Sequence, residues 1–132
     1  PRWRWSACSR NSRIVLRAET KARARALQML YAWEMQGYPS IEAPALARGV
    51  MEQRARLDAE IAATADHWRL ERIGAVERNI LRLGVHELLA GDLPAPVVID
   101  EAVRLARWFA GAKAPAFVNG VLDATARRLG RL

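Results

Sequence analysis

Residues 71–89 read ERIGAVERNILRLGVHELL, and apolar side chains recur in this stretch at helical spacing. The spacing predicts a helix over residues 75–90, and Gly91 is a typical helix end. One face of this helix points inward and carries Val76, Ile80, Leu83 and Leu88. A stripe of this kind predicts a helix that packs against other helices.

The same spacing continues on both sides of this stretch. It predicts helices over residues 19–36, 44–68 and 97–110, and a last one from about residue 115. The helix over 44–68 is long, because one apolar stripe runs from Leu46 to Trp68. Short joints with Gly or Pro separate the segments, and none alternates as a strand does. We therefore expect five helices in an all-α bundle.

The composition is that of a globular domain with a basic arm. Of the 132 residues, 52% are hydrophobic and 27% charged, which allows a buried core that needs no disulfide or metal to stabilise it. We expect a flexible arm over residues 1–17 and a single domain over 18–132. The apolar run 14–16 is too short for a signal peptide, and nothing approaches a membrane span. Because Cys8 is the only cysteine, no internal disulfide forms, and we expect a cytoplasmic protein.

The net charge of +7 is concentrated at the start of the chain. Residues 1–25 hold eight basic side chains and one acidic one, whereas residues 26–132 hold 13 of each. Three of the cations, Lys21, Arg23 and Arg25, head the first predicted helix, where the helix dipole disfavours positive charge. Nucleic-acid phosphates would neutralise them. The alternatives are a solvated basic tail, or upstream sequence that is not native.

The sequence offers no catalytic constellation. His67 and His86 are far apart and lack a Cys/His cluster, so we expect packing or surface roles and no metal. No nucleotide-binding loop or nucleophile elbow occurs. Asp100 and Glu101 are adjacent and diverge by about 100° on a helix, so they suit the first turn of the predicted helix over 97–110. We assign no catalytic residue and no cofactor.

Four segments, taken in order, resemble the NusB family of bacterial transcription antitermination factors. They are ARARALQMLYAWE (22–34), ERIGAVERNILRLGVHELL (71–89), DLPAPVVIDEAVRLARWF (92–109) and FVNGVLD (117–123). The ordered set is more specific than any single segment. The resemblance spans about residues 22–126 and implies an all-helical fold of two small bundles, perpendicular to each other, without enzymatic activity. It also implies binding of the single-stranded boxA element of nascent ribosomal RNA together with NusE, a small-subunit ribosomal protein, so that RNA polymerase resists termination.

The resemblance also implies an RNA site at the head of the first helix. Arg23 stands where the family's arginine-rich motif has its most regular arginine, with Lys21 at a neighbouring basic position and Gln28 one helical step inward. The spacing agrees, because Lys21, Arg25 and Gln28 share one helix face. An exposed basic helix start without RNA is the alternative reading of these cations.

Two residues near the last helix extend this predicted site. The family has an aromatic residue bordering the RNA at Phe117, and its ring can stack on an unpaired base; core packing is the alternative. Lys113 lies in a loop that is often acidic in the family, so we expect it to attract phosphate. Asn119, Gly120 and Asp123 are expected to serve the fold, Asn119 as a capping or local hydrogen-bonding group and Gly120 as a close-contact residue.

Tyr31 and Glu77 match positions that the family uses to meet NusE, with Arg78 nearby. A tyrosine offers an apolar face with a polar tip, and a carboxylate can pair with a basic ribosomal protein. Core packing is the alternative for Tyr31. Arg82 and Glu87 are also matched, and ion pairs are their expected use.

One departure from the family concerns the first bundle. Family members carry a further short helix between the first helix and the long second one, and here only YPSIEAP (38–44) remains. We expect a shortened bundle in which some of Leu27, Leu30, Val50 or Ile61 are under-covered. Such an apolar patch would be covered by the N-terminal arm or by a homodimer.

Other readings remain open at this point. The nearest is the NusB-like domain that precedes some ribosomal-RNA cytosine methyltransferase domains, which would require a following domain with a Gly-rich loop and a catalytic cysteine. The chain ends soon after FVNGVLD, as free-standing members do, so we expect the antitermination factor instead. A helical interaction scaffold without specific RNA binding is a third reading. A DNA-binding helix-turn-helix is a distant fourth.

Overall fold

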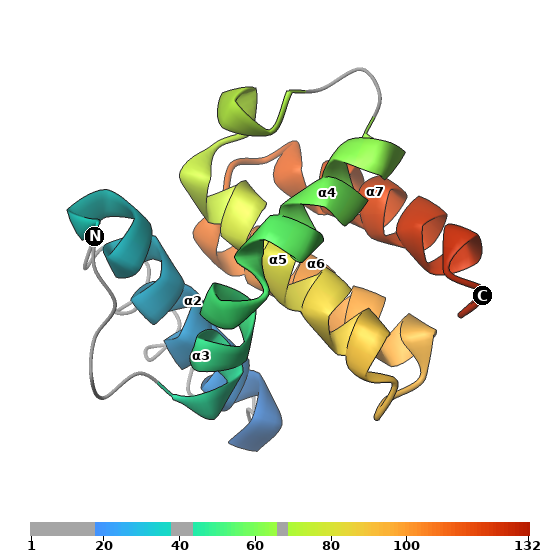
Figure 1. Ribbon diagram of the computed structural model, residues 1–132, viewed down its shortest axis with the longest axis horizontal. Helices are drawn as coiled ribbons and strands as arrows, with labels where there is room; N and C mark the ends of the chain where they lie inside the picture. The colour runs from blue at the N-terminus through green and yellow to red at the C-terminus, as the bar shows by residue number, and fades with distance from the viewer. Residues whose placement is uncertain (1–17, 38–43, 66–68) are drawn as a thin grey trace.

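The computed structural model describes residues 18–37, 44–65 and 69–132 (Figure 1). The predicted arm over residues 1–17, the connector 38–43, and His67 with Trp68 lie outside these ranges. The described residues form six α-helices, one short 3-10 helix and no strand, which confirms the all-α prediction. The elements are α2 (Ala18–Gln36), α3 (Ala45–Glu52), α4 (Arg54–Thr64), η1 (Leu70–Arg72), α5 (Ala75–Ala90), α6 (Ala95–Phe109) and α7 (Ala114–Arg128).

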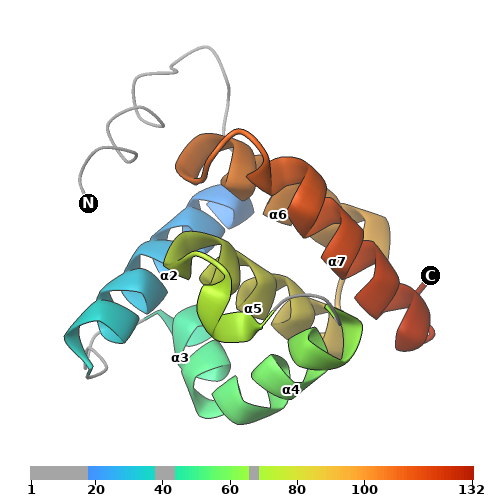
Figure 2. The same cartoon turned by 90° about the horizontal axis from the view of Figure 1, so that it is seen from above.

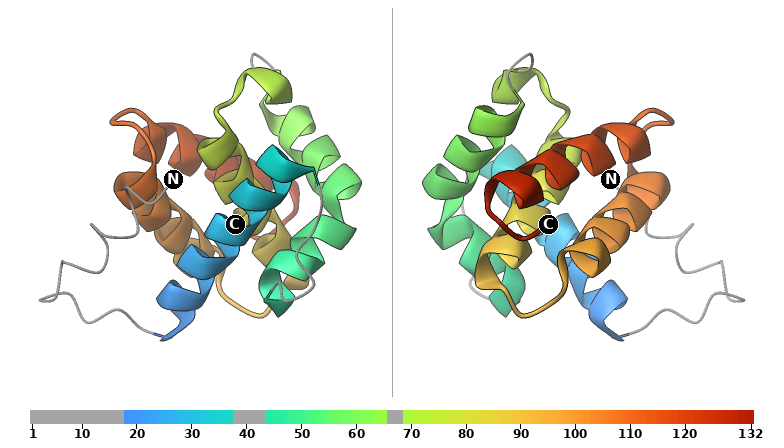
Figure 3. Two further views of the ribbon diagram at one scale, coloured as in Figure 1. Left: turned by 90° about the vertical axis from the view of Figure 1, so that its left-hand side faces the viewer. Right: turned by 90° about the vertical axis from the view of Figure 1, so that its right-hand side faces the viewer.

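Helix α5 is the centre of the molecule. It packs against α2, α3 and α4 on one side and against α6 and α7 on the other (Figure 2). The end-on views of Figure 3 show α3 and α4 in green and α6 in orange on opposite sides of the molecule. The residues from Asn79 to Val85 are all buried, as those of a helix covered from both sides must be. The predicted arrangement of two small bundles is confirmed, and the bundles share this helix.

The predicted long second helix is wrong in one respect, because it is two helices. α3 ends at Glu52 and α4 begins at Arg54, and between them lies Gln53, whose backbone dihedrals are φ −103° and ψ 12°. Backbone hydrogen bonds from Gln53 N to Gly49 O and from Leu57 N to Gln53 O continue across the break, so the chain bends without forming a loop. Both halves, α3 and α4, contact α5.

The predicted gap in the first bundle is also wrong. Leu27 is 3% exposed, and Leu30, Val50 and Ile61 have no exposed surface. These four side chains belong to one core with the buried residues of α5, because α2, α3 and α4 all pack against that helix. The reason for expecting a homodimer across an exposed apolar patch is thereby removed.

The helix ends follow the glycines that the sequence offers. Gly37 and Gly91 end α2 and α5 with φ of 79° and 77°, a left-handed backbone that glycine adopts without strain. The predicted start of α6 at residue 97 is two residues too late. The helix begins at Ala95 and includes Pro96 in its first turn. None of the described helices is long and apolar enough to cross a membrane.

Candidate nucleic-acid interface

The head of α2 presents one polar face to solvent. Lys21, Arg25 and Gln28 are exposed and follow one another at intervals of four and three residues, so they lie along one side of the helix. Neither Lys21 nor Arg25 forms an ion pair within the described ranges. The opposite side of the helix carries Ala26, Leu27 and the core. The predicted face is therefore accessible and positively charged.

Arg23 lies on the other side of α2 and is 7% exposed. Its Nε and Nη2 atoms each donate a hydrogen bond of 2.7 Å to the two carboxylate oxygens of Glu87 on α5. A two-bond pair of this kind is specific in geometry and ties α2 to α5. The ion pair expected for Glu87 is thus confirmed. An RNA contact by Arg23 stays a prediction, and it would require displacement of Glu87.

The start of α2 is also attached to α6. Thr20 Oγ1 donates a hydrogen bond of 3.0 Å to Glu101 Oε2. Glu101 and Asp100 are the seventh and sixth residues of α6, so the expectation that they occupy its first turn is wrong. The contact places the start of α2 beside the second bundle.

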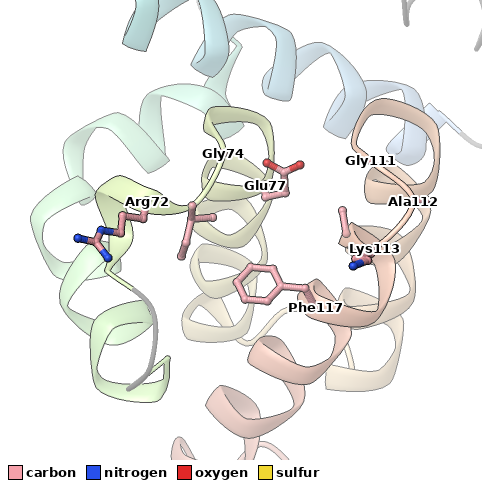
Figure 4. A pocket seen from close by; sticks show the side chains of 9 residues that line it. Arg72, Gly74, Glu77, Gly111, Ala112, Lys113 and Phe117 are labelled. Atoms are coloured by element: carbon pink, nitrogen blue, oxygen red, sulfur yellow. The ribbon is translucent and has the colours of Figure 1, made fainter.

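A pocket of about 520 Å³ opens between the start of α5 and the loop that joins α6 to α7 (Figure 4). It collects residues from η1, α5, the α6–α7 loop and α7. They are Arg72, Ile73, Gly74, Glu77, Gly111, Ala112, Lys113, Ala114 and Phe117. In Figure 4 the Phe117 ring points into the hollow from α7, and the Glu77 side chain lies across from it at the start of α5.

The pocket brings together residues that the sequence assigned to different roles. Lys113 and Phe117 were predicted to contact RNA, whereas Glu77 was predicted to contact the protein partner. Phe117 is half-buried and packs at the edge of the core, and Lys113 is exposed. Because they line one cavity, a ligand that fills it contacts both Phe117 and Glu77.

Arg78 points away from this pocket and into the protein. Its Nε atom donates a hydrogen bond of 2.7 Å to Glu34 Oε1 on α2, and its Nη1 atom bonds the carbonyl oxygens of Leu70 and Ile73. The guanidinium therefore holds η1 against the start of α5. Tyr31 lies one turn before Glu34 on α2 and is half-buried. A partner contact by Arg78 stays a prediction that competes with these bonds.

The ion pair expected for Arg82 is confirmed, but the buried polar network to which it belongs was not predicted from the sequence. Arg82 is 1% exposed and binds both carboxylate oxygens of Asp58 on α4, at 2.7 and 3.1 Å. Its Nη1 atom reaches Asn79 at 3.1 Å and Glu34 at 3.4 Å, and Asn79 donates a bond of 2.6 Å to Glu34. One signal was present in the sequence: Arg82 stands between Leu81 and Leu83 on a helix expected to be buried. Such an arginine needs carboxylate partners.

This network sets the protonation of Glu34. Burial alone would raise the pKa of Glu34, but hydrogen bonds from Arg78 and Asn79 and the charges of Arg82 and Arg78 outweigh it. The pKa of Glu34 therefore lies below its usual value. One turn further along α5 from Arg82, burial lowers the pKa of His86, whose ring lies against Gly49 of α3.

Two expectations for α7 are not met. Gly120 is exposed, and a side chain added there would meet nothing within 4 Å, so it is not a close-contact residue. Asn119 lies in the middle of α7 and caps neither end of it. The close approach is made instead by Gly84 of α5, where an added Cβ would lie 2.7 Å from Leu122 Cδ1 of α7.

The described residues hold no group of three or more His, Cys, Asp or Glu side chains that could bind a metal ion. The described residues offer two surfaces to which a ligand could bind. One is the basic face of α2, and the other is the pocket, which is lined by an aromatic ring and charged side chains. Structurally, the chain is an all-helical protein of two bundles that share α5.

Comparison with known proteins identifies the family. The family model described as the NusB family matches residues 20–127. The chain is 44% identical to the transcription antitermination protein NusB of Solibacter usitatus, over 83% of this chain and 88% of the relative. It is 40% identical to the protein of the same name from Anaeromyxobacter dehalogenans, over 83% and 91% of the two chains. The chain therefore belongs to the NusB family.

Solved structures agree with this assignment. The structure of NusB from T. maritima superposes with a TM-score of 0.74 at 28% identity, over 86% of this chain and 93% of that one. A crystal structure of the antitermination factors NusB and NusE in complex with dsRNA superposes with a TM-score of 0.73 at 29% identity, over 83% and 96% of the chains.

Proposed function

We propose that this protein is a non-enzymatic, RNA-binding transcription antitermination factor of the cytoplasm. It binds the boxA element of nascent ribosomal RNA together with NusE, and the complex makes RNA polymerase more processive. The observation that carries the proposal is the pairing of two accessible features, the basic face of α2 and the pocket lined by Lys113 and Phe117. In a single-stranded RNA, the phosphates can contact the basic face and an unpaired base can enter the pocket.

The basic face of α2 supplies the phosphate contacts. Lys21 and Arg25 have no carboxylate partner among the described residues, and Lys21 lies in the first turn of α2, where the helix dipole repels cations. An RNA phosphate that binds there relieves this unfavourable arrangement. Gln28 adds a neutral donor and acceptor on the same face. Arg23 supports this face from behind through its bonds to Glu87.

The pocket supplies a place for a base. Phe117 offers an aromatic ring, and stacking on such a ring contributes about 1–3 kcal/mol per base. Lys113 stands at the same cavity and attracts the phosphate next to that base. A structural relative was crystallised with NusE and double-stranded RNA. The choice between single and double strands therefore needs a direct test.

Of the three residues predicted to contact NusE, only Tyr31 and Glu77 remain available in the structure. Tyr31 and Glu77 are half-buried with accessible parts, whereas Arg78 is held by Glu34 and two backbone carbonyls. We propose that Tyr31 and Glu77 meet NusE and that Arg78 positions the start of α5 for them.

The experiment is RNA binding followed by fluorescence anisotropy. The labelled RNAs are a single-stranded boxA-type sequence, a scrambled single strand and the boxA-type duplex, each with and without NusE. The proteins are the unmodified chain, Lys21→Ala/Arg25→Ala, and the control Arg48→Ala/Arg56→Ala, which removes the same charge from exposed positions on α3 and α4. We expect the single-stranded boxA RNA to bind best and NusE to tighten it. The first double variant should bind roughly tenfold more weakly, and the control should change much less.

Equal binding of boxA and scrambled RNA, with no effect of NusE, would contradict this function and favour the interaction scaffold. Preference for the duplex would contradict the single-strand proposal while leaving RNA binding in place. Equal weakening in the two double variants would show that only overall charge matters.

A further inference from the structure

One side of α6 carries a cation and a large aromatic ring next to the start of α2. Glu101 accepts a hydrogen bond from Thr20, so it marks the side of α6 that lies toward the first turn of α2. Arg104 and Trp108 follow Glu101 at intervals of three and four residues, which places all three side chains on one side of the helix. The first turn of α2, which includes Lys21, therefore lies beside this side of α6.

The fold leaves the charge of Arg104 without a counter-ion. Within the described ranges its guanidinium forms no ion pair, and its Cζ atom lies 6.0 Å from the centroid of the Trp108 ring. That distance is at the outer limit of cation–π attraction, so the guanidinium is held weakly. By contrast, Arg23, Arg78 and Arg82 are each bound by a carboxylate. Arg104 is thus a cation that an external anion can neutralise.

Trp108 is held by the core and is still accessible. It packs against the hydrophobic core and meets the ring of Phe109 edge-on, with the two ring centroids 6.2 Å apart. The residue is nevertheless only half-buried. Because its ring is already held in place, little side-chain entropy is lost when a flat ligand stacks on it. A ring of this kind is a suitable platform for an unpaired base.

Arg104 and Trp108 lie between the two parts of the proposed RNA site. The basic face begins on α2 near Thr20, which contacts α6 at Glu101. Trp108 is the penultimate residue of α6, and the loop that follows this helix lines the pocket. A strand that runs from the start of α2 to the pocket therefore follows this side of α6.

We propose that Arg104 and Trp108 form an additional RNA contact, in which Trp108 stacks on an unpaired base and Arg104 binds a neighbouring phosphate. The contact does not select a base, because every base has a face on which an aromatic ring can stack. An acidic protein segment would neutralise Arg104, but continuity with the basic face of α2 favours RNA. The inference rests on the proposed function, because it adds a contact for a protein proposed to bind single-stranded RNA.

The test uses anisotropy with the single-stranded boxA-type RNA and its scrambled control. The variants are Arg104→Gln, Trp108→Leu and the conservative Trp108→Phe. The chain offers a matched control, because Arg54 lies over the ring of Trp33, 5.0 Å from its centroid, near the opposite end of α2. Arg54→Gln and Trp33→Leu make the same chemical changes away from the proposed site. Circular dichroism confirms that each variant retains its helices.

We expect Trp108→Leu to weaken RNA binding roughly tenfold, and Trp108→Phe much less, because phenylalanine keeps an aromatic face. Arg104→Gln should also weaken binding, and it should flatten the slope of log affinity against log salt by about 0.7. Both effects should be equal for the boxA-type and scrambled RNAs, since the contact does not select a base. The two control variants should bind as the unmodified chain does.

Three results would overturn the inference and leave the proposed function intact. The first is unchanged RNA binding by Arg104→Gln and Trp108→Leu while Lys21→Ala/Arg25→Ala binds more weakly. The second is equal weakening in these variants and in the two controls. The third is normal RNA binding with weaker NusE binding, which would assign this side of α6 to a protein interface. If the unmodified chain binds none of the RNAs, the proposed function fails together with the inference.

Discussion

Arg82 shows how a single residue can organise the interior of this protein. It is almost completely buried, yet its guanidinium is bound by Asp58, Asn79 and Glu34, which come from α4, α5 and α2. A buried charge is tolerated only when its partners are complete, so the network specifies how these three helices meet. Arg82 thus fixes the relative positions of the three helices, and its removal leaves the carboxylates of Asp58 and Glu34 without this partner.

We expect Arg82→Ala to lower the free energy of unfolding by about 3 kcal/mol, because Asp58 and Glu34 would be deprived of a buried partner. Urea denaturation followed by circular dichroism measures the change. The control is Arg127→Ala, which breaks an exposed ion pair with Asp123 on one face of α7. That variant should change stability by less than about 0.5 kcal/mol. Similar destabilisation in the two variants would contradict the role given to the network.

The lowered pKa of Glu34 predicts a pH dependence of stability. Because the pKa in the folded protein lies below the usual value of 4.5, the stabilisation by the charged form is complete above pH 4.5. It disappears as the pH falls through the folded-state pKa. The Glu34→Gln variant should therefore be less stable than the unmodified chain at neutral pH. The difference in melting temperature between the two should narrow below pH 4.5, and a difference that widened on acidification would contradict the assignment.

At the scale of helices, the packing of α5 against α7 depends on the absence of a side chain at Gly84. An added Cβ would lie 2.7 and 2.9 Å from the two Cδ atoms of Leu122, which is buried and cannot easily move. Gly120, one helical turn along α7 from Phe117, meets nothing. Gly84 is thus required by helix packing, whereas Gly120 is not.

We expect Gly84→Ala to destabilise the protein by about 1–3 kcal/mol through overpacking, despite the better helix propensity of alanine. Gly120→Ala makes the same chemical change at an exposed helical position and should stabilise by up to about 1 kcal/mol. Thermal unfolding of the two variants gives the comparison. Stabilisation by Gly84→Ala would show that the helices are not packed as closely as the structure indicates.

The elements also show what sequence periodicity can and cannot predict. Helices α2 and α5 and their ends at Gly37 and Gly91 follow from apolar spacing and helix-end signals. The bend at Gln53 does not, because the nearest glycine, Gly49, lies four residues earlier inside α3 and the apolar stripe continues across the bend. In the candidate site, the exposed face of α2 was predictable from its own spacing. The partner of Arg23 was not, because Glu87 lies 64 residues further along the chain.

At the scale of the molecule, the proposed binding surface differs from the rest of the protein in its positive charge. The excess of +7 belongs to residues 1–25, and the remainder of the chain is neutral. The arginines of α5 are turned inward to carboxylates, so they add little to the field outside. Lys21 and Arg25 remain outward, beside the second bundle that carries the pocket. The two parts of the proposed site therefore belong to different bundles.

This distribution predicts the salt dependence of RNA binding. Lys21→Ala/Arg25→Ala should flatten the slope of log affinity against log salt by about 0.7 for each phosphate of a single strand that the variant no longer binds. Arg48→Ala/Arg56→Ala should leave the slope nearly unchanged. Titrations at several salt concentrations measure both slopes, and an unaltered slope in the first variant would place the phosphates elsewhere.

The sharing of α5 between the two bundles has a consequence for how the protein comes apart. Each bundle completes its core with the same helix, so opening either bundle exposes a buried side of α5 to solvent. We therefore expect the amide hydrogens in the middle of α5 to exchange with solvent more slowly than those at the helix ends and in the loops. The protein thus behaves as one cooperative unit, and a force or a protease acting on one bundle is resisted by the stability of both.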